Sequence, residues 1–139
     1  MDIPKIRIVN GKKEIFDPVR KIFIAYTSEE FVRQCTILML NSKLNVPFSL
    51  MGVEKQIKVN NLSRRPDIVA FSPQGEVSII VECKAPSVNI DEKTLNQIID
   101  YNLSLHANYL ILTNGISMYC INCKSVPPDF VSIDQVQYL

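Results

Sequence analysis

Three ionisable residues stand at the ends of two neighbouring apolar segments of the chain. Asp67 precedes residues 68–71, and Glu82 and Lys84 close the segment of residues 77–83. Two carboxylates held side by side repel each other, and a divalent cation between them removes the repulsion. Mg²⁺ prefers such oxygen ligands, and a lysine beside it can stabilise charge that develops on a phosphate. The pattern therefore indicates metal-assisted hydrolysis of a phosphodiester.

A hairpin of two antiparallel strands would bring these residues together. The turn sequence Ser72-Pro73-Gln74-Gly75 connects the two apolar segments, so Asp67 should lie beside Glu82 and Lys84. Side chains alternate along a strand, so Cys83 should point to the opposite face and into the core. The second segment is too apolar for a half-exposed strand, which predicts a central strand covered on both faces.

The same residues allow a purely structural interpretation. Asp67 and Glu82 could form ion pairs with Arg65 and Lys84, as charges at strand ends commonly do. An Asp followed at some distance by Glu-x-Lys is a loose pattern, and on spacing alone this second interpretation is favoured.

The elements that would position these residues follow from hydrophobic periodicity and turn signals. We predict helices at residues 28–42 and 91–106, and strands at residues 6–9, 12–16, 20–26, 53–59, 68–71, 77–83, 108–113, 116–121 and 130–133. Asn10-Gly11 supplies the type I′ turn of a hairpin. We therefore expect an α/β (α+β) domain with a mixed central sheet, flanked by helices and preceded by an N-terminal β-hairpin.

The first predicted helix begins with the sequence of a capping box. Thr27 should accept a hydrogen bond from the amide of Glu30, and the Glu30 side chain should reach back to the amide of Thr27. This assigns Glu30 a structural task and leaves Glu29 as the acid without one. Both acids stay candidates for a site, and the capping argument favours Glu29.

Length and composition bound the class of protein. The 139 residues fit one domain, with a hairpin and strand at 1–25, a core at 26–123 and a C-terminal tail at 124–139. No apolar run reaches the roughly 18 residues of a transmembrane helix, and no apolar signal region is visible, so we expect a cytoplasmic protein without membrane contact. The net charge of +1 is lower than that of a typical DNA-coating protein.

Two cysteines have the spacing of half a zinc site. Cys120 and Cys123 are separated by two residues, but the sequence has no second pair of this kind. Reduced thiols of a cytosolic protein are therefore the favoured interpretation.

A group of basic residues precedes Asp67. Its members are Lys55, Lys58, Arg64 and Arg65. They form either a patch that faces phosphates or a solvated strand edge, and the charges alone favour the solvated edge.

Five segments, in this order, give the chain a resemblance to a known family. They are TSEEFVRQ, RRPDIVAF, VSIIVECKAP, LNQIIDYN and YLILTNG, and they cover roughly residues 26–120. Together they resemble the N-terminal nuclease domain of type I restriction enzyme R subunits, within the PD-(D/E)xK nuclease superfamily. The resemblance implies a restriction-endonuclease-like, nuclease-like core at residues 26–123. It also implies endonuclease activity on DNA that depends on Mg²⁺, with Mn²⁺ as a substitute.

The resemblance further implies roles for individual residues. Asp67 and Glu82 match the metal-binding acids of the family, and the backbone carbonyl of Cys83 would be a further metal ligand. Lys84 matches the catalytic lysine, and Glu29 matches the acid of the first helix.

A second group of residues would support the site or contact DNA. Gln97 and Tyr101 match a Gln-x-x-x-Tyr motif of these nucleases, and residues four apart share one face of a helix. They would hold the lysine or touch the DNA backbone, whereas ordinary polar helix surface is the simpler interpretation without the resemblance. Arg64 and Arg65 would contact phosphates.

One departure from the family concerns the motor. Type I R subunits continue into a helicase motor, and this sequence contains no Walker motif or other ATP-binding loop. We expect DNA as a partner and no ATP binding by this chain, which is either a free-standing nuclease-like domain or one whose motor or specificity subunit is encoded separately. The alternative is a catalytically silent module of the same fold that binds DNA or docks on a partner.

Overall fold

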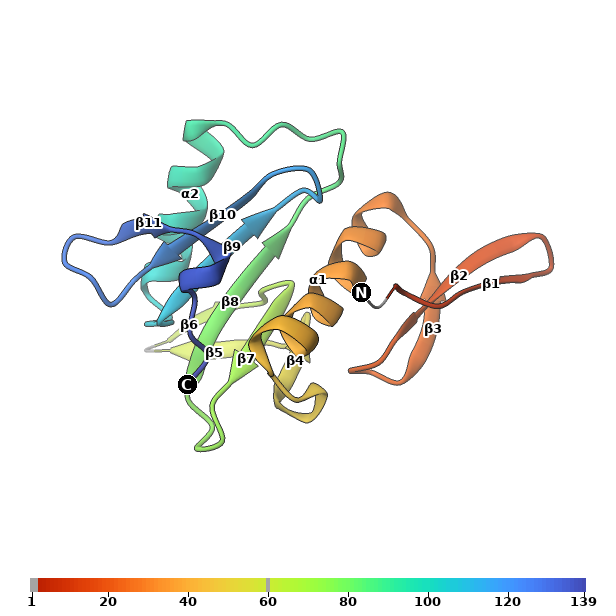
Figure 1. Ribbon diagram of the computed structural model, residues 1–139, viewed down its shortest axis with the longest axis horizontal. Helices are drawn as coiled ribbons and strands as arrows, with labels where there is room; N and C mark the ends of the chain where they lie inside the picture. Colours follow the sequence, from red (N-terminus) through yellow and green to blue (C-terminus); the bar gives the residue numbers. More distant parts are fainter. Residues whose placement is uncertain (1–2, 60) are drawn as a thin grey trace.

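The computed structural model describes residues 3–59 and 61–139, and its centre is a mixed β-sheet (Figure 1). In this part of the chain the sheet has six strands in the order β11-β10-β9-β8-β7-β4. These strands are β4 (Met51–Val53), β7 (Ile68–Phe71), β8 (Val77–Cys83), β9 (Tyr109–Thr113), β10 (Met118–Asn122) and β11 (Asp129–Val131). β8 and β9 run parallel and the other neighbours run antiparallel, which confirms the mixed central sheet.

Each face of the central sheet carries one α-helix of the described residues. The helices are α1 (Ser28–Leu44) and α2 (Glu92–Leu103). Ile79 and Val81 of β8 belong to the core that includes residues of α1, whereas Ile80 belongs to the core that includes Leu95 of α2. β8 is therefore buried on both faces, which explains why its sequence is almost uniformly apolar.

Local sequence signals fix the ends of both helices. The Thr27 side chain accepts a hydrogen bond from the amide of Glu30 (2.9 Å), and Asn45 ends α1 in the left-handed conformation. Asp91 caps α2 by accepting from the amide of Thr94 (2.7 Å). The second helix is shorter than predicted, because it ends at Leu103 rather than near residue 106.

A separate antiparallel sheet precedes α1. It consists of β1 (Ile6–Val9), β2 (Lys12–Asp17) and β3 (Ile22–Ala25), and we call it the N-terminal sheet. Asn10 and Gly11 both have positive φ angles, as the type I′ turn requires, so the predicted hairpin is confirmed. Figure 1 shows this sheet projecting from the molecule on the far side of α1 from the central sheet.

The predicted strand at residues 53–59 is wrong. β4 ends at Val53, and Glu54 then turns the chain through a left-handed conformation (φ 52°). A second strand, β5 (Ile57–Val59), leaves the central sheet and pairs with β6 (Leu62–Arg64) in a small hairpin. Polar and apolar residues alternate along this segment whether it forms one strand or two. The sequence pattern therefore gave no sign of the break at Glu54.

The C-terminal tail supplies the edge strand β11 of the central sheet. β11 lies at residues 129–131, close to the predicted strand at 130–133, and the short 3₁₀ helix η2 (Ile133–Gln135) follows it. A second 3₁₀ helix, η1 (Phe48–Leu50), leads into β4. Of the helices that the structure describes, none is long and apolar enough to cross a membrane.

Candidate active site

The β7–β8 hairpin brings the two predicted acids together. Ile68 pairs with Val81, and the same register places Asp67, which precedes β7, beside Glu82. Asp67 also accepts a hydrogen bond through Oδ2 from the amide of Cys83 (2.7 Å). Burial of Glu82 and its hydrogen bond to Asp67 raise the pKa of Glu82 from 4.5 to about 8, despite the opposing charges of Lys84 and Arg33. The structure thus places a proton-sharing carboxylate pair at the end of the central hairpin.

The neighbouring residues of β8 alternate as the sequence predicts. The Cys83 side chain is buried in the core that contains α1, and burial raises the pKa of its thiol. Lys84 follows the strand and donates its amide to the carbonyl of Thr113 (2.9 Å). Its charge lies close enough to Glu82 to oppose the rise of the carboxyl pKa. Asp67, Glu82 and Lys84 therefore gather at one end of β8, while the Cys83 thiol packs.

A buried arginine from α1 reaches the acid pair. Arg33 is 5% exposed, and its Nη2 lies 3.2 Å from Oδ1 of Asp67. The other terminal nitrogen, Nη1, donates to Glu54 (2.9 Å) and lies 3.3 Å from Glu30. Both oxygens of Asp67 thus have donors, one from Arg33 and one from the backbone of β8. The carboxylates around Arg33 raise the pKa of its guanidinium against the opposing effect of burial, which keeps the side chain charged.

Glu29 and Glu30 lie on different sides of Arg33. Glu29 is 3.9 Å from Nη2, the nitrogen that also contacts Asp67, and its side chain is half exposed. Glu30 lies beside Nη1, and its other oxygen accepts from Gln34 (3.1 Å). The second half of the expected capping box is therefore wrong: the Glu30 carboxylate is bound to α1 side chains and Thr27 alone caps the helix. Glu29 is the acid of the pair on the Asp67 side.

The charged network continues from Arg33 to the base of the N-terminal sheet. Arg20 donates to Asp17 (2.7 Å) and lies 3.8 Å from Glu54, the partner of Arg33. Asp17 is fully buried and also accepts from Gln34 of α1 (3.1 Å). A buried carboxylate needs such partners because desolvation penalises its charge. The network ties the N-terminal sheet to the acid pair through a continuous set of ion pairs and hydrogen bonds.

The sequence prediction missed the parts of this network that come from distant segments. Arg33 follows Glu29 by four residues and Glu30 by three, which is a helical ion-pair spacing that could have been recognised. Glu54 carries no comparable signal, because its position depends on the turn that ends β4.

The predicted supporting residues divide into two groups. Tyr101 accepts a hydrogen bond from the amide of Arg65 (3.4 Å), and the guanidinium of Arg64 lies 4.5 Å from the centre of its ring. Tyr101 of α2 thus holds the end of β6, directly before Pro66 and Asp67. Gln97 is exposed and, within residues 3–59 and 61–139, makes no side-chain hydrogen bond. Neither residue of the pair holds Lys84.

The acid pair suits a divalent cation in its donor chemistry. Asp67 and Glu82 supply hard oxygen donors, and their repulsion adds to the effect of burial in raising the pKa of Glu82. No cluster of three or more His, Cys, Asp or Glu side chains arranged for a metal occurs in the described ranges. Two carboxylates nevertheless match the way Mg²⁺ binds, since this ion keeps several of its waters. The residues present therefore fit such an ion.

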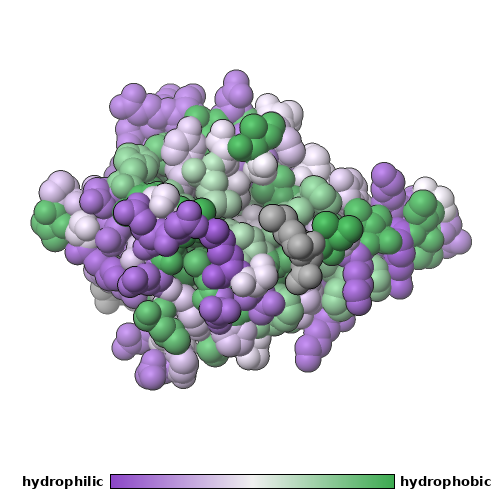
Figure 2. Space-filling view, in the orientation of Figure 1, coloured by the Kyte–Doolittle hydropathy of each residue, from purple (hydrophilic) through white to green (hydrophobic). Residues whose placement is uncertain are grey.

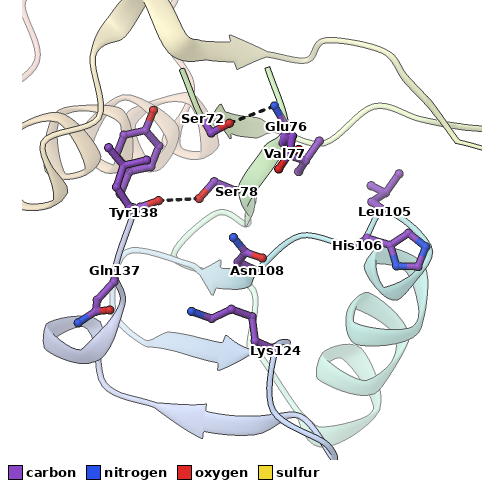
Figure 3. A pocket seen from close by; sticks show the side chains of 11 residues that line it. Ser72, Glu76, Val77, Ser78, Leu105, His106, Asn108, Lys124, Gln137 and Tyr138 are labelled. Atoms are coloured by element: carbon purple, nitrogen blue, oxygen red, sulfur yellow. Dashed lines mark hydrogen bonds between the residues drawn. The ribbon is translucent and has the colours of Figure 1, made fainter. Parts of the chain in front are cut away.

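A cavity of about 490 Å³ lies at the opposite end of β8 (Figure 3). Its lining includes His106 and Asn108 together with Lys124, and Ser78 on its wall donates to the carbonyl of Tyr138 (3.0 Å). Val77 and Ser78 begin β8, whereas Glu82 lies near its end. The cavity is therefore distinct from the acid pair.

The two closely spaced cysteines do not face each other across a common site. All four cysteines are free thiols. Cys120 is buried in the core with α1, where burial raises the pKa of its thiol to about 11, whereas Cys123 packs on the core with α2. This arrangement agrees with thiols that pack rather than with a half zinc site.

The mixed sheet with two carboxylates and a lysine at the end of its central hairpin agrees with a restriction-enzyme-like nuclease domain, the class that comparison with known families gives. Residues 28–136 match the family described as the type I restriction enzyme R protein N terminus (HSDR_N). The match covers most of the chain, so the protein belongs to this family. No curated protein matches the sequence significantly.

A solved structure shares the fold. It is the crystal structure of a DUF820 protein from Anabaena variabilis ATCC 29413, described as a candidate nuclease. The TM-score is 0.51 at 12% sequence identity, and the alignment covers 94% of this chain and 79% of that chain. Identity this low supports a common fold and carries no residue roles.

Proposed function

We propose that this protein is a metal-dependent endonuclease that hydrolyses DNA phosphodiesters. The observation that carries the proposal is the Asp67–Glu82 pair, in which burial of Glu82, its hydrogen bond to Asp67 and the repulsion between the two acids raise the pKa of Glu82 to about 8. A cation between the two carboxylates would remove that repulsion. Membership of the R-subunit N-terminal family supports DNA as the substrate.

Mg²⁺, or Mn²⁺ in its place, would be held by Asp67, Glu82 and the backbone carbonyl of Cys83. Such an ion, when bound, polarises a phosphate and makes a water molecule more acidic. Asp67 is oriented for this task by the amide of Cys83 (2.7 Å) and by Arg33 (3.2 Å). Because each donor binds a different oxygen, together they hold the Asp67 carboxylate in one orientation.

Lys84 would act on the reacting phosphate. It follows Glu82 by two residues, and its ammonium influences the Glu82 carboxyl. A positive charge in this place stabilises the negative charge that grows on the phosphate oxygens. Glu29, on the Asp67 side of Arg33, would complete the acidic surface that surrounds the reacting group.

Residues on the β5–β6 hairpin would hold the DNA backbone. Arg64 and Arg65 stand three and two residues before Asp67, and Tyr101 fixes this segment by its hydroxyl and its ring. Gln97, one helical turn before Tyr101 and exposed, would contact the same backbone. A motor or specificity subunit, as the R-subunit family implies, would bring this domain to its DNA.

Plasmid cleavage tests the proposal. Supercoiled plasmid is incubated with Mg²⁺, Mn²⁺ or EDTA and with the parent protein, Asp67→Asn or Lys84→Ala, each purified identically. Asp129→Asn and Lys124→Ala, at exposed positions remote from the acid pair, serve as matched controls. We expect cutting by the parent and both controls with either metal, and none by the two site variants. Cutting that survives Asp67→Asn and Lys84→Ala would come from a contaminant or another site and would end the proposal.

A silent binding module is the second candidate, and Arg33 favours it. Arg33 already satisfies one Asp67 oxygen and neutralises the acids without a cation. Salt-sensitive DNA binding by the parent, with no cutting in Mg²⁺ or Mn²⁺, would establish this candidate instead.

A further inference from the structure

The N-terminal sheet carries the positive charge of this protein. Residues 3–25 contain six basic and two acidic residues, a net charge of +4, whereas the whole chain has +1. The remainder of the chain is therefore net negative, at −3. A protein that binds a polyanion needs a positive surface, and here the excess lies on one small sheet.

Four lysines of this sheet are open to solvent. They are Lys5, Lys12, Lys13 and Lys21. The two acids of the sheet are already engaged, because Glu14 pairs with Arg7 (2.8 Å) and Asp17 pairs with Arg20 (2.7 Å). Within residues 3–59 and 61–139, none of the four lysines forms an ion pair. Their charges are thus available to an external partner.

The shape of the N-terminal sheet suits a groove of duplex DNA. Every residue of β1 is exposed, and the β1–β2 ribbon projects away from the body of the molecule (Figure 1). Six residues of β2 span about 20 Å, and the DNA major groove, about 12 Å wide, admits a two-stranded ribbon. Lys12 and Lys13 are adjacent in β2, so they point to opposite faces of the ribbon. The phosphate backbones run along both edges of a ribbon that lies in a groove, within reach of long lysine side chains from either face.

The exposed surface of the ribbon is mixed rather than uniformly polar. Figure 2 shows hydrophobic and hydrophilic residues alternating over the projecting sheet. Ile6, between the basic residues Lys5 and Arg7, is 46% exposed, and Ile8, which follows Arg7, is 68% exposed. Apolar side chains of this kind can contact thymine methyl groups at the floor of the major groove.

The base of the sheet is fixed to the candidate active site. Asp17 at the end of β2 binds Arg20, and Arg20 lies 3.8 Å from Glu54. Glu54 binds Arg33, which in turn binds Asp67. A duplex held by the ribbon would therefore have a defined position relative to the acid pair.

We propose that the N-terminal sheet is a DNA-contacting arm whose β1–β2 ribbon enters a groove of the duplex that the acid pair cuts. The choice of DNA as its partner rests on the proposed function. A second protein chain that pairs with the exposed edge of β1 is the rival occupant. The net charge of +4 favours DNA over the second protein chain, because backbone pairing along the edge of β1 would make no use of four lysines without ion-pair partners.

Fluorescence anisotropy in EDTA measures this binding without any cleavage. The probe is a fluorescein-labelled duplex of random sequence and two helical turns. The parent is compared with Lys12→Gln/Lys13→Gln and with the control Lys43→Gln/Lys124→Gln, which removes the same charge from exposed positions outside the N-terminal sheet. Lys12 and Lys13 are exposed, so the variant should keep its fold, and thermal unfolding checks this.

We expect the arm variant to bind DNA about tenfold more weakly at low salt, with a salt slope reduced by about two, since each lysine accounts for about one phosphate contact. The control should bind within about twofold of the parent by the same reasoning. Equal binding by all three proteins would overturn the proposal, and so would a parent that does not bind the duplex in about 50 mM salt. Light scattering that shows self-association lost in Ile8→Ser, with DNA affinity unchanged, would assign the sheet to a second copy instead.

The arm and the nuclease can fail separately. A plasmid left uncut by a parent whose DNA binding depends on Lys12 and Lys13 would end the nuclease proposal and keep the arm. Metal-dependent cutting by a parent whose DNA binding does not depend on Lys12 and Lys13 would end the arm proposal and keep the nuclease proposal.

Discussion

Glu82→Gln should stabilise the metal-free protein at alkaline pH. The ordinary pKa of a glutamate is 4.5, and burial together with Asp67 raises the pKa of Glu82 to about 8 in the folded chain. Between these two values the folded state binds more protons than the unfolded state, so stability falls as pH rises from about 4.5 to about 8. Glutamine has the same shape, can donate to Asp67, and never ionises.

The expected gain in the free energy of unfolding follows from the shift of the Glu82 pKa. A lone group with these two pKa values would cost roughly 5 kcal/mol of stability at about pH 8.5. Glu82 is only partly buried, so solvent screening reduces the expected cost to about 1–3 kcal/mol. The Gln variant should therefore exceed the parent by this amount at about pH 8.5 and match it at about pH 5, where Glu82 is protonated in the folded parent.

Urea unfolding in EDTA at several pH values measures the difference. Glu76→Gln removes an exposed carboxylate from the β7–β8 turn and serves as the control, which should follow the parent at every pH. If the free energies of unfolding of the parent and of Glu82→Gln run parallel from about pH 5 to pH 8.5, the close contact between the acids is refuted.

Three further results are expected. Mg²⁺ should raise the melting temperature of the parent at alkaline pH and leave that of Asp67→Asn unchanged, as differential scanning fluorimetry can show; equal shifts would place the ion elsewhere. Arg33→Met should lower the free energy of urea unfolding by about 3 kcal/mol, because it removes the buried guanidinium that the surrounding carboxylates share; a loss within about 0.5 kcal/mol would contradict the network around Arg33. Tyr101→Ala should weaken DNA binding more than Tyr101→Phe does, because only the alanine removes the ring on which Arg64 lies; equal anisotropy curves would exclude this support.

The sequence was sufficient to predict the acid pair because that pair depends on local rules. A turn at residues 72–75 fixes the β7–β8 hairpin, and strand alternation then decides which side chains share a face. Asp67 beside Glu82 and a buried Cys83 follow from these two facts alone. The apolar residues of β8 predicted its central place, since residues 79–81 put apolar side chains on both faces of the strand.

The surroundings of the acid pair could not be predicted in the same way. Arg33 reaches Asp67 only because α1 packs over β7 and β8, and that packing brings together residues 34 positions apart. Glu54 depends on a left-handed turn at a residue that usually avoids it. The Thr27–Glu30 capping pattern was half right, since tertiary partners compete for the Glu30 carboxylate and bind it instead.

The topology of the hairpin has a consequence for the order in which the protein folds. Asp67 and Glu82 are only 15 residues apart, whereas the parallel pairing of β8 with β9 joins residues about 30 positions apart, such as Val81 and Ile111. Closing the shorter loop costs less chain entropy. We therefore expect the β7–β8 hairpin to form early and to bring the two repelling carboxylates together. Arg33 would contact them, and β9 would pair with β8, only later. Pulse-labelling hydrogen exchange that found β9 amides protected before those of β7 would contradict this order. Low pH, which protonates the pair, should then speed the earliest step of folding.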